Sequence, residues 1–386
     1  MEQRIKQHWT VQKDFLEIDK MPFYWRLTAD GRPFAGIPQK LPIRVARDSD
    51  FDYLRCQPTD VEWQALELAY RQNATIGFIN DESGHLDTYG ASANSFFLKN
   101  IQTRKPERIY EIGCGAGFSI RFLRDKGWRV VGVDPSEYSS VWSEKLGFEL
   151  INDFFSPDLL AENAQFIFCN DVFEHVPHVK RFAKEVFDSL SENGTFAIVT
   201  TNSSDSIQLG DISMLEHQHV NMFTEKSIYQ ILSDAGFSNI TIESGSYGST
   251  FQITAEKKKK AEAPLELNSL EDSTTFFLER ACSRIRAFEK LYKSAGILKC
   301  YVPLRCIPYL ATVADYGDTQ IFDSNSSWAG KFIDGYSNPI RNLEGYTASV
   351  GHQFFVGSLT FCKQITKTLI SSGVPDENIH SVKSIV

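Results

Sequence analysis

The amino-acid sequence predicts an α/β protein centred on a mostly parallel β-sheet. From residue 108 onward, short apolar runs alternate with amphipathic stretches of helical length, which is typical of right-handed β-α-β units. A glycine-rich turn at 111–117 joins the first run to the first amphipathic stretch. Beyond residue 298 the alternation resumes over a shorter length. A second, smaller α/β unit is therefore expected near the C-terminus.

The central unit is expected to hold seven strands, of which the last two form an antiparallel hairpin at the sheet edge. Each predicted strand is a short apolar run, and each predicted helix ends near glycine or a polar turn. The strands are predicted at 108–113, 128–134, 148–152, 165–171, 194–202, 239–244 and 250–256, with helices at 118–127, 139–147, 178–192 and 225–236.

The regions on either side follow different patterns. The first hundred residues are rich in aromatic side chains, with helices expected at 59–72 and 91–101, and are otherwise predicted to be helical or irregular. A run of four lysines (257–260) indicates an exposed junction, and a long helix is expected near 270–294. Helices at 304–314 and 361–372 accompany strand-like runs in the last unit. The predicted domains are an N-terminal substrate or lid region (1–104), the central ligand-binding domain (105–258), a linker with the long helix (259–298) and a C-terminal α/β domain (299–386).

The composition excludes several classes of protein. The 386 residues carry 40 basic and 49 acidic side chains, and this net charge of −9 argues against nucleic-acid or anionic-membrane binding. Seven scattered cysteines without a close CxxC pair argue against disulfides and against a structural zinc site, and no metal is expected. No signal-peptide core or long apolar run is present, so we expect a cytoplasmic protein. The sequence does not decide between a monomer and a homodimer.

The turn EIGCGAG at 111–117 carries the clearest chemical information. Gly113 and Gly115 would let the backbone turn tightly and approach a ligand, and the following helix N-terminus offers free N–H groups. A dinucleotide-binding turn needs another glycine where this chain has Phe118, which disfavours an oxidoreductase. Glu111 is placed to meet a positively charged group.

Two acids follow the next two strands. Asp134 ends the run VVGVD, where a carboxylate commonly accepts hydrogen bonds from ribose hydroxyls. The alternative is that Asp134 caps a helix with Pro135 at its first position. Asp153, followed by Phe154, is suited to an adenine amino group and ring face.

In order and spacing, EIGCGAG, VVGVDPS, FCNDVFEHV and NGTFAIVTTN resemble the class I S-adenosylmethionine-dependent methyltransferases over residues 105–256. The resemblance implies a Rossmann-like sheet, S-adenosyl-L-methionine as cofactor and a small-molecule acceptor. We therefore predict cofactor contacts from the residues of the turn and of the three following strand ends: Glu111, Gly113, Cys114, Gly115, Gly117, Asp134, Pro135, Asp153, Phe154, Asn170 and Asp171. His175 matches a residue that is frequent near the mouth of this site.

The outer segments resemble the sugar C-methyltransferases, which act on nucleotide-linked keto sugars. The segment MLEHQHVNMFT (214–224) is similar to their Glu-His segment, and DTYGASANSFF (87–97) to their tyrosine-bearing segment. The last part of the chain resembles their C-terminal α/β domain. This likeness implies a nucleotide-sugar acceptor and a role in sugar biosynthesis.

This sequence departs from that pattern in three places. The N-terminal zinc-binding cysteine cluster of these enzymes is missing, because Cys56 stands alone. The tyrosine two places before the Glu-His pair is Met214. The glycine-rich first turn of the C-terminal domain is replaced by VPLRCIPYL (302–310), where Leu304 and Arg305 cannot give the same close approach to phosphate.

Methyl transfer to carbon also needs a base beside a carbonyl. A histidine next to a carboxylate suits that task, so we predict His217 as base with Glu216 beside it, provided that the pair lies in a loop. Tyr89 is predicted to hydrogen-bond the acceptor or cover the sulfonium, and His175 to lie at the site. The alternatives are methylation of oxygen or nitrogen on a sugar or natural product, and a cofactor-binding scaffold without turnover.

Overall fold

The computed structural model describes residues 8–23, 27–29, 36–48, 53–72, 88–245, 249–258, 273–313, 319–333, 336–344, 346 and 351–385. The chain forms two compact units. One consists of residues 66–203 and 220–270, and the other of 1–65, 204–219 and 271–386. The N-terminal and C-terminal regions thus share one unit, which differs from the predicted division into separate domains. Of the predicted linker and long helix (259–298), residues 259–272 lie outside the described residues.

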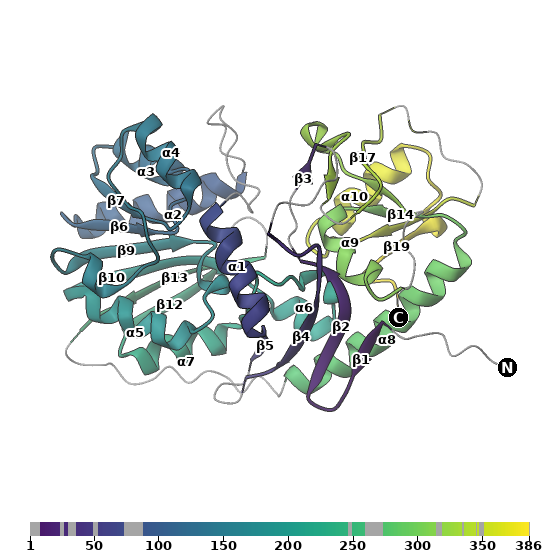
Figure 1. Cartoon of the computed structure of the whole chain (residues 1–386), viewed down its shortest axis with the longest axis horizontal. Helices are drawn as coiled ribbons and strands as arrows, with labels where there is room; N and C mark the ends of the chain where they lie inside the picture. The colour runs from purple at the N-terminus through teal and green to yellow at the C-terminus, as the bar shows by residue number, and fades with distance from the viewer. Residues whose placement is uncertain are drawn as a thin grey trace. The chain divides into compact units, whose positions relative to one another are not determined.

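The unit of residues 66–203 and 220–270 contains the predicted seven-stranded sheet (Figure 1). Its strand order is β12-β13-β10-β9-β6-β7-β8. The central pairs are parallel, whereas β13 runs antiparallel to both β10 and β12, so the predicted edge hairpin is confirmed. The strands are β6 (Ile109–Ile112), β7 (Val130–Val133), β8 (Leu150–Ile151), β9 (Ala164–Asn170), β10 (Leu190–Thr201), β12 (Ser238–Ser244) and β13 (Thr250–Glu256).

Helices lie on both faces of this sheet, as Figure 1 shows: α2 and α3 along one face, α5 and α7 along the other. Strands that are covered on both faces are apolar throughout, which explains the uninterrupted apolar runs in the sequence. Within the unit, the helices are the last part of α1 (Asp60–Gln72), α2 (Thr88–Arg104), α3 (Phe118–Arg124), α4 (Glu137–Leu146), α5 (Val179–Ser189) and α7 (Glu225–Ala235). The short elements are the 3-10 turns Pro157–Leu159 and Phe173–His175 and the strand β11 (Asn221–Met222).

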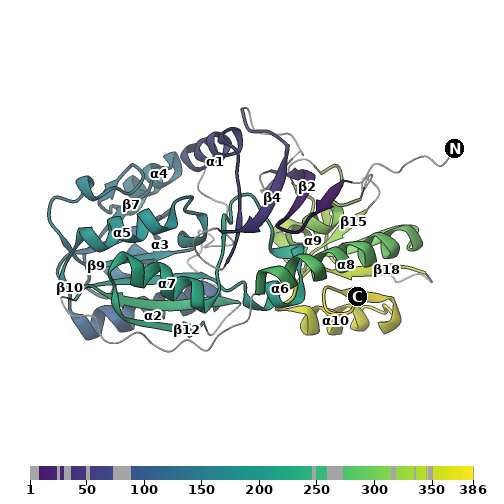
Figure 2. The same ribbon diagram turned by 90° about the horizontal axis from the view of Figure 1, so that it is seen from below.

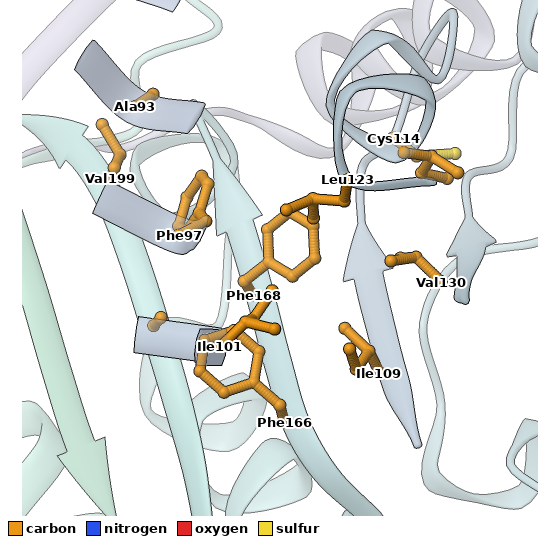
Figure 3. Close-up of a cluster of buried hydrophobic side chains, with 12 residues drawn as sticks. Ala93, Phe97, Ile101, Ile109, Cys114, Leu123, Val130, Phe166, Phe168 and Val199 are labelled. Carbon is orange, nitrogen blue, oxygen red and sulfur yellow. The ribbon is translucent and has the colours of Figure 1, made fainter. Parts of the chain in front are cut away.

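A cluster of buried side chains joins α2 to the sheet (Figure 3). Phe97 of α2 contacts Phe168 of β9 with ring centroids 4.6 Å apart, and Ile101 lies one turn further along the helix. Both phenylalanines are fully buried. This packing fixes α2 against the strands that carry the glycine-rich turn and the Asn170–Asp171 segment.

Four strands within the described part of the first sixty residues form an antiparallel sheet, so the prediction of a helical or irregular region is wrong here. Its strands pair in the order β1-β2-β4-β5, and side chains such as Leu16 and Ile18 are fully buried. Pro42 lies inside β4, opposite the register shift between Ile18 and Met21 of β2. A proline lacks the N–H group that pairing requires, and the irregularity accommodates it. The strands are β1 (Trp9–Val11), β2 (Phe15–Pro22), β4 (Lys40–Arg47) and β5 (Leu54–Cys56).

The C-terminal part holds a parallel five-stranded sheet in the order β17-β15-β14-β18-β19, which confirms a second α/β unit. Phe355 of β18 contacts Phe288 of α8, while the adjacent Phe354 packs with Ile365 of α10. Neighbouring strand residues point to opposite faces, so α8 and α10 cover opposite sides, as Figure 2 shows. The elements are α8 (Ser273–Ser294), β14 (Leu298–Tyr301), α9 (Pro303–Leu310), β15 (Gln320–Phe322), β17 (Ile340–Arg341), β18 (Gln353–Val356), α10 (Cys362–Ser371) and β19 (Ile379–Ser381).

The remaining elements of this unit are short. They are β3 (Leu27–Thr28) paired with β16 (Phe332–Ile333), α6 (Ser204–Leu209), and the 3-10 turns Ile212–Met214, Ser326–Trp328 and Asp376–Asn378. Among the described residues of the whole chain, no helix is both long and apolar enough to span a membrane.

Candidate functional site

The turn between β6 and α3 contains three glycines in the left-handed region of the backbone map. The φ angles are 72° at Gly113, 50° at Gly115 and 71° at Gly117. A Cβ atom on Gly113 would lie 2.3 Å from Cγ2 of Val172, and one on Gly117 would lie 2.3 Å from the Phe148 ring. A Cβ on Gly115 would meet no described heavy atom within 4 Å. Packing therefore requires the outer two glycines, and the middle one leaves its backbone open to a ligand.

Asp134 connects this turn to the end of β7. Its Oδ2 accepts the N–H of Gly115 at 2.8 Å, and its Oδ1 accepts the N–H and Oγ of Ser136 at 2.9 and 2.6 Å. Ser136, not Asp134, caps α4, and its Oγ accepts the Ser139 N–H. The alternative in which Asp134 caps the helix with Pro135 at its first position is therefore wrong. Pro135 lies between the carboxylate and the cap.

Cys114 contributes only backbone to this turn. Its side chain is buried in the cluster of Figure 3, and its Sγ would lie 2.6 Å from a Cβ on Gly132 of β7. Burial, followed by the charge of Asp134, raises the pKa of the thiol well above its ordinary value. The thiol is thus an apolar packing group.

Two buried polar atoms at the carboxyl ends of β6 and β9 have no hydrogen-bond partner among the described residues. They are Oε2 of Glu111 and Oδ1 of Asn170. Burial raises the pKa of the Glu111 carboxyl well above its ordinary value, against a lowering by a hydrogen bond from Ser119. Buried polar groups are nearly always paired in folded proteins, so two such acceptors indicate a place for a ligand with donor groups.

Asp171 follows Asn170 with a φ of 52°, which is uncommon for a residue other than glycine. Its Oδ2 accepts the Asn170 side-chain amide at 3.2 Å, and its Oδ1 accepts the hydroxyl of Tyr89 from α2. The structure thus brings together three residues that the sequence predicted for one site.

His175 lies in the 3-10 turn after β9. Its Nδ1 is 3.3 Å from the hydroxyl of Tyr70 in the last turn of α1, and the two rings meet edge to face. Glu174 beside it is fully buried, and one of its oxygens accepts the hydroxyl of Thr200 at 2.8 Å. No motif in the sequence marks Tyr70 as part of this site.

Asp153 and Phe154 follow β8 and are partly exposed. Oδ1 of Asp153 accepts the N–H of Phe154 at 2.8 Å and lies 3.6 Å from the guanidinium of Arg71. The same guanidinium lies over the Phe154 ring, 4.7 Å from its centroid. Arg71 was also missed, because a helical arginine in the last turn is common at helix C-termini.

The segment with Glu216 and His217 belongs to the other unit. Glu216 pairs with His219, whose Nδ1 lies 2.7 Å from Oε1, rather than with His217. Nε2 of His217 donates to the Pro42 carbonyl at 3.0 Å, and burial lowers the pKa of this imidazole to about 4. Nδ1 of His217 has no hydrogen-bond partner among the described residues. Glu216 and His217 therefore do not form the predicted pair: Glu216 pairs with His219, and His217 bonds to the backbone of Pro42.

The departure at 302–310 also has a structural counterpart. Val302 has a φ of 65° at the start of α9, where a glycine would be expected. Pro303 has no N–H, and the N–H groups of Arg305 and Cys306 both donate to the Val302 carbonyl. Most of the donors that a helix N-terminus offers to a phosphate are therefore absent or used.

The part of the chain that holds the glycine-rich turn is similar to known proteins. Residues 87–242 match the family model of a methyltransferase domain. The ubiquinone biosynthesis O-methyltransferase of Rickettsia prowazekii (strain Madrid E) is 26% identical over 185 residues, which are 42% of this chain and 72% of that protein. The C-methyltransferase NovU of Streptomyces niveus is 19% identical over 171 residues, 43% of this chain and 41% of its own length.

Solved structures cover a similar part of the chain. The plantazolicin methyltransferase BpumL in complex with SAH has a TM-score of 0.37 at 17% identity, over 44% of this chain and 84% of that chain. Human N-acetylserotonin methyltransferase in complex with SAM has a TM-score of 0.37 at 16% identity, over 44% of this chain and 52% of that chain.

The buried acceptors of Glu111 and Asn170, and the open space beside Gly115, fit the ammonium and carboxylate groups of S-adenosylmethionine. These features lie in the part of the chain that the family covers. Residues 87–242 of the chain are therefore a methyltransferase domain, and its activity is S-adenosylmethionine-dependent methyl transfer.

Proposed function

We propose that this enzyme methylates a carbon atom next to a carbonyl, in a nucleotide-linked keto sugar or a related carbonyl metabolite. The observation that carries the proposal is the histidine–carboxylate pair of His219 and Glu216, at 2.7 Å. A methyl transfer to carbon needs such a base, because the acceptor must first lose a proton. The likeness of part of the chain to a C-methyltransferase agrees with this choice.

We assign the cofactor contacts by the chemistry of each group. Glu111 and Asn170 would accept the ammonium group, the Gly115 backbone would approach the amino-acid end, and Asp134 would receive the ribose hydroxyls. Asp153 and Phe154 would hold the adenine. The bound cofactor supplies an electrophilic methyl group on a sulfonium, and the protein supplies position and a dry pocket.

The proton transfer is assigned to His219. Oε1 of Glu216 accepts from Nδ1, which fixes the tautomer and makes Nε2 the basic nitrogen. Nε2 takes the proton next to the carbonyl, and the electron pair of that C–H bond forms an enolate. The enolate carbon would be the nucleophile for the methyl group that the bound cofactor supplies, and Glu216 would stabilise the imidazolium formed on His219.

His217, the base predicted from sequence, is better suited to position this segment. With a pKa of about 4 it is neutral at pH 7, but it is a weak base. Its bond to the Pro42 carbonyl and its contact with the Phe23 ring, 5.0 Å between centroids, fix it within its own unit.

A second candidate function is methylation of oxygen. The relative at 26% identity is an O-methyltransferase, and a histidine–carboxylate pair can also deprotonate a hydroxyl. The two functions differ in one observable, because only the carbon acceptor exchanges a carbon-bound proton with solvent before methylation.

The test is incubation with candidate keto-sugar nucleotides in D₂O, followed by mass spectrometry and NMR. We expect deuterium next to the ketone and a new carbon–methyl bond, with His219→Ala losing both by about 100-fold, within the range for general-base removal. The variant should keep its calorimetric affinity for S-adenosylhomocysteine. Methylation without exchange favours an oxygen or nitrogen acceptor. If His219→Ala exchanges at the wild-type rate and His217→Ala does not, His217 is the base and the assignment to His219 is wrong.

A further inference from the structure

We propose that Arg71 is a positioning residue for the adenine end of the cofactor, acting through Asp153 and Phe154. The inference rests on the assignment of Asp153 to adenine in the proposed function. It adds a residue from α1 that lies outside every segment of the methyltransferase motifs. All of the residues concerned belong to one compact unit.

The two oxygens of Asp153 have different surroundings. Oδ1 accepts the Phe154 N–H at 2.8 Å and faces the Arg71 guanidinium at 3.6 Å. Among the described residues, no hydrogen bond or ion pair reaches Oδ2. A carboxylate held by one oxygen presents the other in a fixed direction, and the exocyclic amino group of adenine is a donor that such an oxygen can accept.

Phe154 is held by the same guanidinium. The Cζ atom of Arg71 lies 4.7 Å from the ring centroid, a distance at which a cation is attracted by the ring face. Phe154 is partly exposed, at 36% of the residue's surface, so it retains apolar area for a ligand to cover. One cation therefore orients both the acceptor and the ring.

The last turn of α1 gives Arg71 and its neighbour Tyr70 further contacts. Nε of Arg71 also donates to Oε1 of Glu67 one turn earlier, at 3.4 Å. The preceding residue, Tyr70, contacts His175 at 3.3 Å. The last turn of α1 thus touches the segment after β8 and the segment after β9, both of which carry predicted contacts of the cofactor site.

A lone ion pair at this exposure contributes little to stability, since both side chains keep contact with water. A bound adenine would cover the pair and lower the local dielectric, which strengthens it. The effect of Arg71 is therefore expected in ligand selectivity rather than in the melting temperature of the free protein.

The experiment compares two ligands by calorimetry: S-adenosylhomocysteine and S-inosylhomocysteine, in which an oxygen replaces the adenine amino group. The wild type should prefer the adenosine compound. Arg71→Ala should weaken its binding about 5- to 10-fold and that of the inosine compound less than about twofold, in line with the loss of one charge-assisted contact. Arg71→Lys should restore part of the preference.

The matched control is Arg129→Ala, which removes another exposed ion pair of the same unit, to Glu149 at 2.7 Å. It should change neither affinity. Asp153→Ala should abolish the preference, and adding Arg71→Ala to it should cause no further loss, because the arginine acts through this carboxylate.

The possible failures are distinguishable. If Arg71→Ala weakens both ligands equally or neither, while Asp153→Ala abolishes the preference, the role of Arg71 is overturned and the adenine assignment stands. If Asp153→Ala leaves the preference intact, the assignment of Asp153 fails and this inference fails with it. If the wild type binds neither ligand, the cofactor contacts of the proposed function are overturned.

Discussion

Glu111 is a buried carboxyl group whose hydrogen bonding is incomplete within the described residues. It is 3% exposed, and its Oε2 lacks a hydrogen-bond partner among the described residues. Burial without a cation disfavours the ionised form, which is why its pKa is raised. Such a carboxyl destabilises the free protein at neutral pH and gains a partner when an ammonium group binds.

Glu111→Gln should therefore stabilise the free enzyme and weaken the cofactor. The folded protein retains a proton that the unfolded chain releases above a pKa near 4.5, so the stability from this site falls as pH rises through the raised pKa. The variant should melt above the wild type at pH 8, and the difference should shrink toward pH 4.5. Its affinity for S-adenosylhomocysteine should fall about tenfold or more.

Differential scanning calorimetry from pH 5 to pH 8 and titration calorimetry measure both effects. Asp188→Asn, at an exposed ion pair with Lys184 on α5, is the control and should change neither. Equal melting temperatures at pH 8 together with unchanged affinity would remove Glu111 from the site.

At the scale of the element, different glycines of the β6–α3 turn serve packing and ligand binding. Gly113 and Gly117 face Val172 and Phe148, so their small size serves the fold. Gly115 faces open space and donates its N–H to Asp134. The sequence marked all three glycines, and only the structure shows that they have different tasks.

Gly115→Ala should therefore weaken cofactor binding more than it destabilises the fold. The φ of 50° costs an alanine about 1 kcal/mol, and the added methyl group occupies the space offered to the ligand. Gly147→Ala is a matched control, because Gly147 has a φ of 67° and equally open space at the C-cap of α4.

Urea unfolding should show a similar loss in the free energy of unfolding for both variants. Only Gly115→Ala should lose affinity for S-adenosylhomocysteine. Gly113→Ala should be the least stable of the three, since its Cβ would overlap Val172. Equal affinity of the Gly115 and Gly147 variants would show that the turn does not contact the cofactor.

The strands of the first sixty residues are the longest elements that could not be predicted from the sequence. Leu16 and Ile18 alternate with Glu17 and Asp19 in β2, which is a strand pattern, but it is short and ends at Pro22. In β4 the pattern is interrupted by Pro42, which sequence rules exclude from a central strand. The register shift in β2 that accommodates Pro42 lies about twenty residues away in the chain, so the local sequence around Pro42 does not reveal it.

At the scale of the whole molecule, the chain is divided into two units that are each discontinuous in sequence. The unit of residues 66–203 and 220–270 holds every predicted cofactor contact. A ligand that binds only there should stabilise that unit, by about 2.7 kcal/mol at a hundredfold excess over its Kd.

Hydrogen exchange with and without S-adenosylhomocysteine should locate this stabilisation. We expect slower exchange in 109–117, 130–136 and 166–172, at the carboxyl ends of β6, β7 and β9. The strands β14 and β18 of the other unit serve as the internal control and should be unchanged. Protection confined to β14 and β18 would place the ligand at the C-terminal sheet and contradict the cofactor site.

The sequence by itself determined the central sheet, its edge hairpin and the glycine-rich turn. These features are local: apolar runs mark buried strands, and left-handed turns require glycine. The tertiary structure decided what depends on distant partners: which histidine pairs with Glu216, which residue caps α4 and which arginine reaches Asp153. Neighbours along the chain, such as Glu216 and His217, can point apart, whereas Arg71 and Asp153 meet only when the sheet and α1 are assembled.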